Sequence, residues 1–168
     1  FARGLSASGI ACVRFDQAGC GESTGAFQDL TIPRMAADTL AVVHYLQNQS
    51  WCDTGRLGMV GISLGALPTV AVDAQVNTAA VALWAPVFDM PHVFSLTART
   101  GLRGILDGQG WVPYRGLRIG KSFVDQLDAI QTPGAVAASS APLLLLHSRS
   151  DAVVPFDQSE AYAQACQE

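Results

Sequence analysis

The residues Gly61-Ile62-Ser63-Leu64-Gly65 have the types and the spacing of a serine nucleophile site. An apolar run, residues 57–60, precedes them, and a stretch with helical character, residues 66–74, follows. Glycines on both sides of the serine allow a sharp, strained turn from strand to helix, where larger side chains would collide with the crossing segments. Such a turn exposes the Ser63 hydroxyl and places the Leu64 N–H at a helix N-terminus, where an oxyanion would form. The pattern predicts Ser63 as a nucleophile and Leu64 as an oxyanion donor.

Short apolar strands and amphipathic helices alternate around this motif. The pattern predicts strands at 10–15, 56–62, 78–87 and 141–147, and helices ending near residue 8 and spanning 33–49, 64–75 and 156–167. This alternation is typical of an α/β fold, a mostly parallel sheet with helices on both faces. The glycine-rich stretch 88–140 breaks the rhythm, and we interpret it as a small cap inserted in a single domain spanning 1–168.

With these features, the chain resembles the α/β-hydrolase superfamily, and within it the small bacterial esterases, including cinnamoyl and feruloyl esterases, and the serine aminopeptidase group. Relatives carry a D-x-R-G-x-G-x-S pattern after one strand, and here it stands as Asp16-Gln17-Ala18-Gly19-Cys20-Gly21-Glu22-Ser23. Ala18 replaces the usual arginine, and Cys20 replaces a frequent histidine. The resemblance also implies a strand order of 1-2-4-3-5-6-7-8, with segment 10–15 as the fourth strand and segment 56–62 as the fifth. The third strand, which would lie between these two in the sheet, is absent from the sequence.

The resemblance implies the catalytic acid as well. Relatives carry it in a turn after a late strand, often as H-G-x-x-D-x-x-V-P. Here this pattern stands as His147-Ser148-Arg149-Ser150-Asp151-Ala152-Val153-Val154-Pro155, so the resemblance points to Asp151. The alternative is that Asp151 is a surface residue that caps a turn before the last helix.

Acyl transfer also needs an imidazole to take the serine proton. In this superfamily the order along the chain is serine, acid, histidine, and no histidine follows Asp151. We expect His44 to be a helical surface residue, His92 to be exposed in the cap and His147 to be structural. The chain is therefore expected to be incomplete at both ends, with the base after residue 168 and the second oxyanion donor before Phe1.

Bulk composition excludes several classes of function. The net charge is −4, the pI is about 5.2 and no basic cluster is present, so we expect no nucleic-acid partner. No apolar run approaches a membrane span, and no signal peptide is visible. Four cysteines without C-x-x-C spacing are typical of a reduced compartment, and we expect a cytoplasmic protein. The turn at 19–25 lacks the lysine of a P-loop, and no residues have metal-ligand spacing, so we expect neither cofactor nor metal.

Three functional hypotheses follow. The first is a serine hydrolase that cleaves carboxylic esters through an acyl-Ser63 intermediate, acting on a small-molecule substrate. The second is a peptidase of the same fold, because ester and amide hydrolysis use the same residues. The third is a pseudo-hydrolase that binds a ligand without catalysis. Aromatic residues of the cap could line the substrate pocket, or they could pack the cap onto the body; they are Phe94, Trp111, Tyr114 and Phe123.

Overall fold

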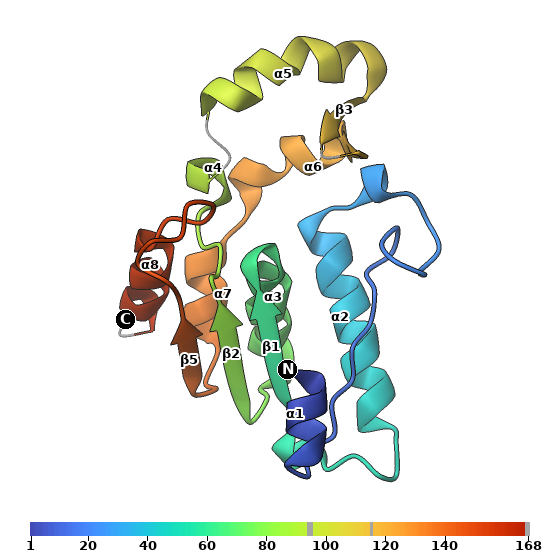
Figure 1. Cartoon of the computed structure of the whole chain (residues 1–168), viewed down its shortest axis with the longest axis vertical. Helices are drawn as coiled ribbons and strands as arrows, with labels where there is room; N and C mark the ends of the chain where they lie inside the picture. Colours follow the sequence, from blue (N-terminus) through green and yellow to red (C-terminus); the bar gives the residue numbers. More distant parts are fainter. Residues whose placement is uncertain (94–95, 115, 167–168) are drawn as a thin grey trace.

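The computed structural model describes residues 1–93, 96–114 and 116–166. Within these residues, three parallel strands form the main sheet in the order β1 (Gly58–Ile62), β2 (Ala80–Trp84) and β5 (Leu143–Leu146) (Figure 1). Gly61 pairs with Leu83, which pairs in turn with Leu145. The expected α/β class is confirmed, since the structure has a parallel sheet flanked by helices. The strands are shorter than predicted, because the residues at the ends of each apolar run are not part of the strand pairing.

One face of the sheet packs on helices. Alternate strand residues, such as Val81 and Leu83, lie buried against α3 (Ala66–Val76), α7 (Thr132–Ala138) and α8 (Asp157–Ala165). Tyr162 of α8 is fully buried in this layer, and its hydroxyl donates to the Val87 carbonyl at 3.0 Å. The helices therefore hold the strand ends in fixed positions.

The opposite face carries apolar side chains that remain exposed in the described residues. They are the alternate residues Val60 and Ile62 of β1, Trp84 of β2, and Leu144 and Leu146 of β5, each about half exposed. Strand side chains point to alternate faces, so these five belong to one surface. In the described residues, the sheet is thus covered on one face and open on the other.

Residues 10–15 do not form the predicted strand. They follow α1 (Ala2–Ala7) and Gly9, whose positive φ of 77° ends that helix, and they run between β1 and α2 in the view of Figure 1. A strand requires backbone hydrogen bonds to a neighbour, and among the described residues β1 pairs only with β2. The apolar side chains of this segment stay partly exposed for the same reason.

Helix α2 (Ile32–Gln47) forms where the apolar spacing predicts it. The Thr31 side chain caps it by accepting from the Arg34 N–H at 3.3 Å, and a proline lies in its first turn. Its buried face carries Ile32, Met35, Thr39, Val43 and Leu46. The short helix η2 (Thr54–Arg56) then leads into β1, which is why this strand begins two residues later than predicted.

Residues 88–140 contain their own small elements. These are α4 (Met90–Val93), α5 (Leu96–Gln109), the antiparallel hairpin of β3 (Trp111–Tyr114) and β4 (Leu117–Gly120), α6 (Lys121–Asp125), η4 (Leu127–Ala129) and α7. Figure 1 shows α5, β3 and α6 beyond the arrowheads of the strands, at their carboxyl ends. One core cluster joins these elements to the body, with Leu106, Val112 and Phe123 packed together with Met35 and Leu67. No helix in the described ranges has the length and apolar character needed to cross a membrane.

Candidate active site

Ser63 lies at the turn between β1 and α3, as the first residue of η3 (Ser63–Gly65). Its φ is +52°, in the left-handed region that non-glycine residues rarely adopt. Gly61 is required for this turn, since a Cβ there would lie 2.7 Å from Thr69 Oγ1 and 2.9 Å from Ala66 Cα. The chain thus stores backbone strain at the predicted nucleophile, whose side chain is half-buried.

Gly65 does not share this constraint. Its φ is −63°. A Cβ added at Gly65 would have no heavy atom of the described residues within 4 Å, apart from its chain neighbours and the backbone of its own helix. The prediction that both flanking glycines avoid a collision is therefore wrong for Gly65. Gly61 precedes the turn and faces α3, whereas Gly65 has already adopted the helical conformation with its α-carbon facing open space.

Leu64 has the position expected of an oxyanion donor. Its N–H belongs to the first turn of the helix that follows β1, where backbone N–H groups have no acceptor within the helix. The partial positive charge of a helix N-terminus adds to the effect of this donor. The Leu64 side chain packs against the core cluster that joins segment 88–140 to the rest of the chain, and this packing holds the backbone in place.

The turn after β2 adds a contact that sequence reasoning missed. Ala85 has a φ of +45° immediately before Pro86, and its N–H donates to the Leu146 carbonyl at 2.7 Å. Two residues later, the Val87 N–H donates to the Ser63 carbonyl at 3.2 Å. This turn therefore connects the end of β5 to the serine. The only signal in the sequence is Pro86, which interrupts the apolar run 78–87.

Asp151 lies in the loop after β5, with its side chain 22% exposed. Its Oδ1 accepts from the N–H groups of Val154 at 2.9 Å and Val153 at 2.8 Å. These two hydrogen bonds lower the pKa of the Asp151 carboxyl below its ordinary value of 3.8 against the opposing effect of desolvation. The carboxylate is therefore ionised and held in one orientation, as an acid that orients a base must be.

The three histidines lie apart from the Ser63 hydroxyl. His147 is 1% exposed, and its ring nitrogens lie 2.7 Å from Ser159 Oγ and 3.0 Å from the Val154 carbonyl oxygen. His92 is half exposed and pairs with Asp157 at 3.5 Å. His44 is exposed on α2. Both ring nitrogens of His147 are engaged, and no contact between a histidine and Ser63 occurs in the described part of the chain.

Ser63 and Asp151 nevertheless share one edge of the sheet. Ser63 follows β1 and Asp151 follows β5, with β2 between these strands, and all three run parallel. Neighbouring strands lie about 4.8 Å apart, so the two strand ends are separated by roughly 10 Å. An imidazole fits in a gap of this size, and its two nitrogens could face the serine and the carboxylate. The structure thus brings Ser63 and Asp151 to the same edge, and none of the described histidines lies between them.

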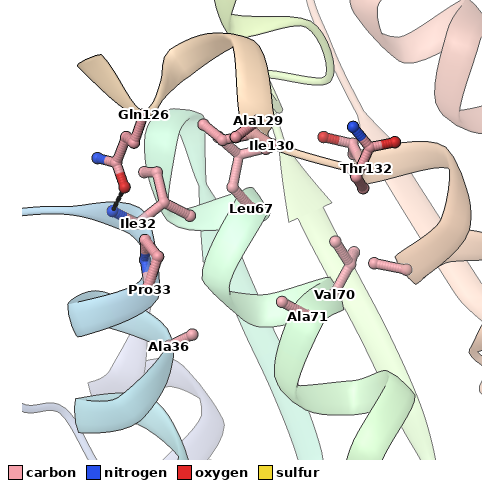
Figure 2. Close-up of a pocket in the computed structure, with 12 residues that line it drawn as sticks. Ile32, Pro33, Ala36, Leu67, Val70, Ala71, Gln126, Ala129, Ile130 and Thr132 are labelled. Carbon is pink, nitrogen blue, oxygen red and sulfur yellow. Dashed lines mark hydrogen bonds between the residues drawn. The ribbon is translucent and has the colours of Figure 1, made fainter. Parts of the chain in front are cut away.

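A pocket of about 230 Å³ lies beside this edge (Figure 2). Its apolar wall comes from the start of α2, from α3 and from the segment joining η4 to α7, and includes Ile32, Leu67 and Val70. Gln126 borders it and accepts a hydrogen bond from the Ile32 N–H at 3.1 Å. Neither Ser63 nor Asp151 lines this pocket. The pocket therefore lies between helices next to the site, and it does not enclose Ser63 or Asp151.

The predicted cap aromatics have different environments. Phe123 is buried in the core cluster, so it packs the segment onto the body. Trp111 is half-buried beneath the Arg118 guanidinium, whose carbon lies 4.2 Å from the ring centroid. Tyr114 is 45% exposed, and Phe94 lies outside the described residues. Among the residues with described placement, no group of histidine, cysteine and acidic side chains could hold a metal ion.

Similar solved structures include the ferulic-acid-bound Est1E of Butyrivibrio proteoclasticus, with a TM-score of 0.78, 22% identity, and coverage of 98% of this chain and 67% of that one. The esterase domain of a Rhodothermus marinus protein has a TM-score of 0.66 and 25% identity, over 98% of this chain and 63% of that one. Both likenesses agree with the fold and with the resemblance inferred from the sequence.

Among curated proteins, an uncharacterised protein of Mycobacterium tuberculosis is 28% identical over 164 residues, which are 98% of this chain and 50% of the relative. The chain thus spans about half the length of the curated relatives that it matches over its full extent. The model of the X-Pro dipeptidyl-peptidase (S15) family matches residues 3–114, a range that includes the Ser63 turn, β2 and about half of segment 88–140. By this match and by its fold, the chain belongs to the X-Pro dipeptidyl-peptidase (S15) family of the α/β-hydrolase superfamily.

Proposed function

We propose that the protein is a serine hydrolase that forms an acyl-enzyme on Ser63. The observation that carries this proposal is the left-handed backbone of Ser63 at the tip of β1, on the same sheet edge as Asp151. A strained serine is costly to the fold, and it is typical of a residue whose hydroxyl must project from the sheet. In this proposal, Ser63 attacks the substrate carbonyl and the Leu64 N–H stabilises the resulting oxyanion.

Asp151 acts as the acid of the triad. Its ionised carboxylate orients an imidazole and stabilises the imidazolium that forms when Ser63 loses its proton. The two backbone donors from Val153 and Val154 occupy Oδ1, so Oδ2 is the oxygen offered to the base. We propose that the base is a histidine outside residues 1–168, since His44, His92 and His147 lie away from Ser63.

The substrate is a carboxylic ester in this proposal, and the cap segment 88–140 bounds its binding site. Structural similarity to esterases supports ester cleavage, as does the position of this segment beyond the carboxyl ends of the strands. The second candidate is peptide cleavage, which the match to the X-Pro dipeptidyl-peptidase family favours. Both reactions pass through the same acyl-Ser63 intermediate, so only the leaving group distinguishes them.

The test uses the full-length protein and a fluorophosphonate probe, which reacts with activated serines. We expect stoichiometric labelling of the wild type, none of Ser63→Ala, and normal labelling of the matched control Ser50→Ala, since Ser50 is exposed and remote from the turn. Hydrolysis of p-nitrophenyl butyrate and of an Xaa-Pro p-nitroanilide, each compared with Ser63→Ala, then separates ester from peptide cleavage. A folded wild type that neither reacts with the probe nor cleaves either substrate would indicate a pseudo-hydrolase.

A further inference from the structure

We propose that His147 and Ser159 form a positioning pair that fixes the direction of the Asp151 carboxylate. This inference rests on the proposed function, because it assigns a role in aligning the catalytic acid. Neither residue touches the reacting atoms, so both act through the loop 148–154. The pair connects this loop to α8, the helix that packs on the covered face of the sheet.

The hydrogen-bond partners determine the tautomer of His147. Its Nε2 lies 3.0 Å from the Val154 carbonyl oxygen, which can only accept, so this nitrogen carries the proton. In the neutral ring, Nδ1 then presents a lone pair, which accepts the Ser159 hydroxyl proton across 2.7 Å. The ring is 1% exposed, so water cannot replace either partner. The Val154 carbonyl therefore selects the tautomer, and the Ser159 hydroxyl supplies the donor that the other ring nitrogen then needs.

Val154 transmits this constraint to the acid. Its carbonyl accepts from His147, while its N–H donates to Asp151 Oδ1 at 2.9 Å. Its side chain is also buried in the core cluster that joins body and cap segment. The peptide groups around Val154 are thus held on both sides, and the carboxylate cannot rotate without breaking one of these contacts.

The arrangement leaves the second carboxylate oxygen available. Asp151 Oδ2 lies 3.8 Å from His147 Nε2, beyond hydrogen-bond distance, so His147 orients the acid without occupying the oxygen offered to the base. The other charged groups nearby have separate partners. Arg149 stacks on Phe156, whose ring is 5.6 Å from that of His147, and Asp157 pairs with His92.

The experiment compares Ser159→Ala, His147→Leu and His147→Gln with the wild type in the full-length protein. Active sites are counted by fluorophosphonate titration, so that partial misfolding does not lower the measured rate per site. For Ser159→Ala and His147→Leu, we expect kcat per titrated site to fall about 10- to 100-fold, by analogy with residues that orient metal ligands from outside the ligand shell. KM should change less than about twofold. His147→Gln should recover much of kcat, because its amide can donate to Val154 and accept from Ser159.

The pH profile separates positioning from a purely structural role. A misdirected carboxylate stabilises the protonated base less, so the acid limb of kcat/KM should move to lower pH in Ser159→Ala and His147→Leu. Simple loss of folded protein would lower the amplitude and leave the limb in place. The control is His44→Leu, at an exposed histidine of α2, and it should behave as the wild type.

Nitrogen-15 NMR of the His147 ring in the wild type tests the geometry independently of activity. We expect a protonated Nε2 and an unprotonated Nδ1, and the opposite tautomer would overturn the proposal even if the variants fail to fold. Wild-type kcat and an unmoved acid limb in both variants would also overturn it. Failure of the proposed function gives a different result, because the wild type itself would then remain unlabelled.

Discussion

At the scale of single residues, Ala85 combines two unfavourable features at the sheet edge. It has a positive φ of 45°, and it precedes a proline, which disfavours the helical regions of the backbone. Its N–H also bonds to Leu146 beside the turn that holds the Ser63 carbonyl. We expect Ala85→Gly to change the free energy of unfolding by less than about 1 kcal/mol, because relief of strain offsets the entropy of glycine.

Ala85→Val should instead destabilise the protein by about 1–3 kcal/mol, since a branched residue tolerates this conformation least. Urea denaturation of the full-length variants measures both effects. Equal stability of the valine and glycine variants would show that the positive φ of Ala85 is not a source of strain.

Asp151 allows a direct test of its catalytic role. Asp151→Asn should lower kcat by orders of magnitude, because the base loses both its orienting partner and the charge that stabilises its protonated form. The corresponding change in chymotrypsin-type proteases costs about 10⁴-fold, which serves here as an analogy. The measurement is steady-state kinetics per fluorophosphonate-titrated site. A loss below about tenfold would assign the acid elsewhere, and Asp125 and Asp128 would be tested next.

The lowered pKa of Asp151 also predicts how stability depends on pH. A carboxyl group whose folded pKa lies below its unfolded value of about 3.8 stabilises the fold at any pH above that value. This contribution is lost as the pH falls through the folded pKa. We therefore expect the stability difference between wild type and Asp151→Asn to be constant from pH 7 to about pH 5 and to shrink in more acidic solution. Denaturation curves across this range provide the measurement, and a difference that grows on acidification would contradict the lowered pKa.

At the scale of secondary-structure elements, Asp73 connects helix α3 to the segment after α7. It is fully buried, and its carboxylate accepts from the Thr78 N–H at 2.9 Å, from the Thr78 hydroxyl at 2.5 Å and from the Ser139 hydroxyl. Each buried donor left without a partner costs about 1–3 kcal/mol. Asp73→Ala should therefore destabilise the protein by more than about 2 kcal/mol.

The matched control for this change is Glu22→Ala, at an exposed acidic residue whose carboxylate forms no hydrogen bond or ion pair with the part of the chain that the structure describes. It should change stability by less than about 0.5 kcal/mol. Thermal unfolding followed by circular dichroism compares the two variants. Similar melting temperatures would show that the Asp73 contacts do not contribute to holding α3 and α7 together.

At the scale of the whole molecule, we expect the open face of the sheet to determine the solubility of residues 1–168 when they are expressed alone. Five large apolar side chains, from Val60 to Leu146, are about half exposed on one surface, and β1 has one edge unpaired among the described residues. Such patches and edges promote association between molecules. We expect this segment, expressed by itself, to be insoluble or molten and inactive on p-nitrophenyl esters.

Trp84→Thr with Leu144→Thr should increase the soluble fraction of the segment, whereas Tyr45→Thr should not, because Tyr45 is exposed on α2 away from this face. Sedimentation and light scattering measure the difference. A soluble, cooperatively unfolding monomer with ester hydrolysis that depends on Ser63 would contradict this prediction, and it would require one of the three histidines as the base.

The class of fold and the positions of the main elements are predictable from local patterns in the sequence. Hydrophobic periodicity is local, so it predicts the amphipathic helix after Thr31, the three strands of the main sheet and the Ser63 turn. The G-x-S-x-G spacing predicted a strained serine between strand and helix, and the left-handed φ of Ser63 agrees with it. The assignment of Ser63, Leu64 and Asp151 to catalysis stays a prediction.

Which residues constrain one another depends on how the elements pack in three dimensions. Segment 10–15 has the composition of a strand, yet it forms none, because pairing depends on a neighbour and not on local propensity. Gly61 is required by the approach of α3 whereas Gly65 is not, a difference that two identical glycines cannot show in sequence. The same is true of two hydrogen bonds at the sheet edge. Ala85 bonds to Leu146 of β5, and His147 bonds to Ser159 of α8, and all four residues are distant from Ser63 in the sequence. Both bonds arise from packing between elements, which no local pattern encodes.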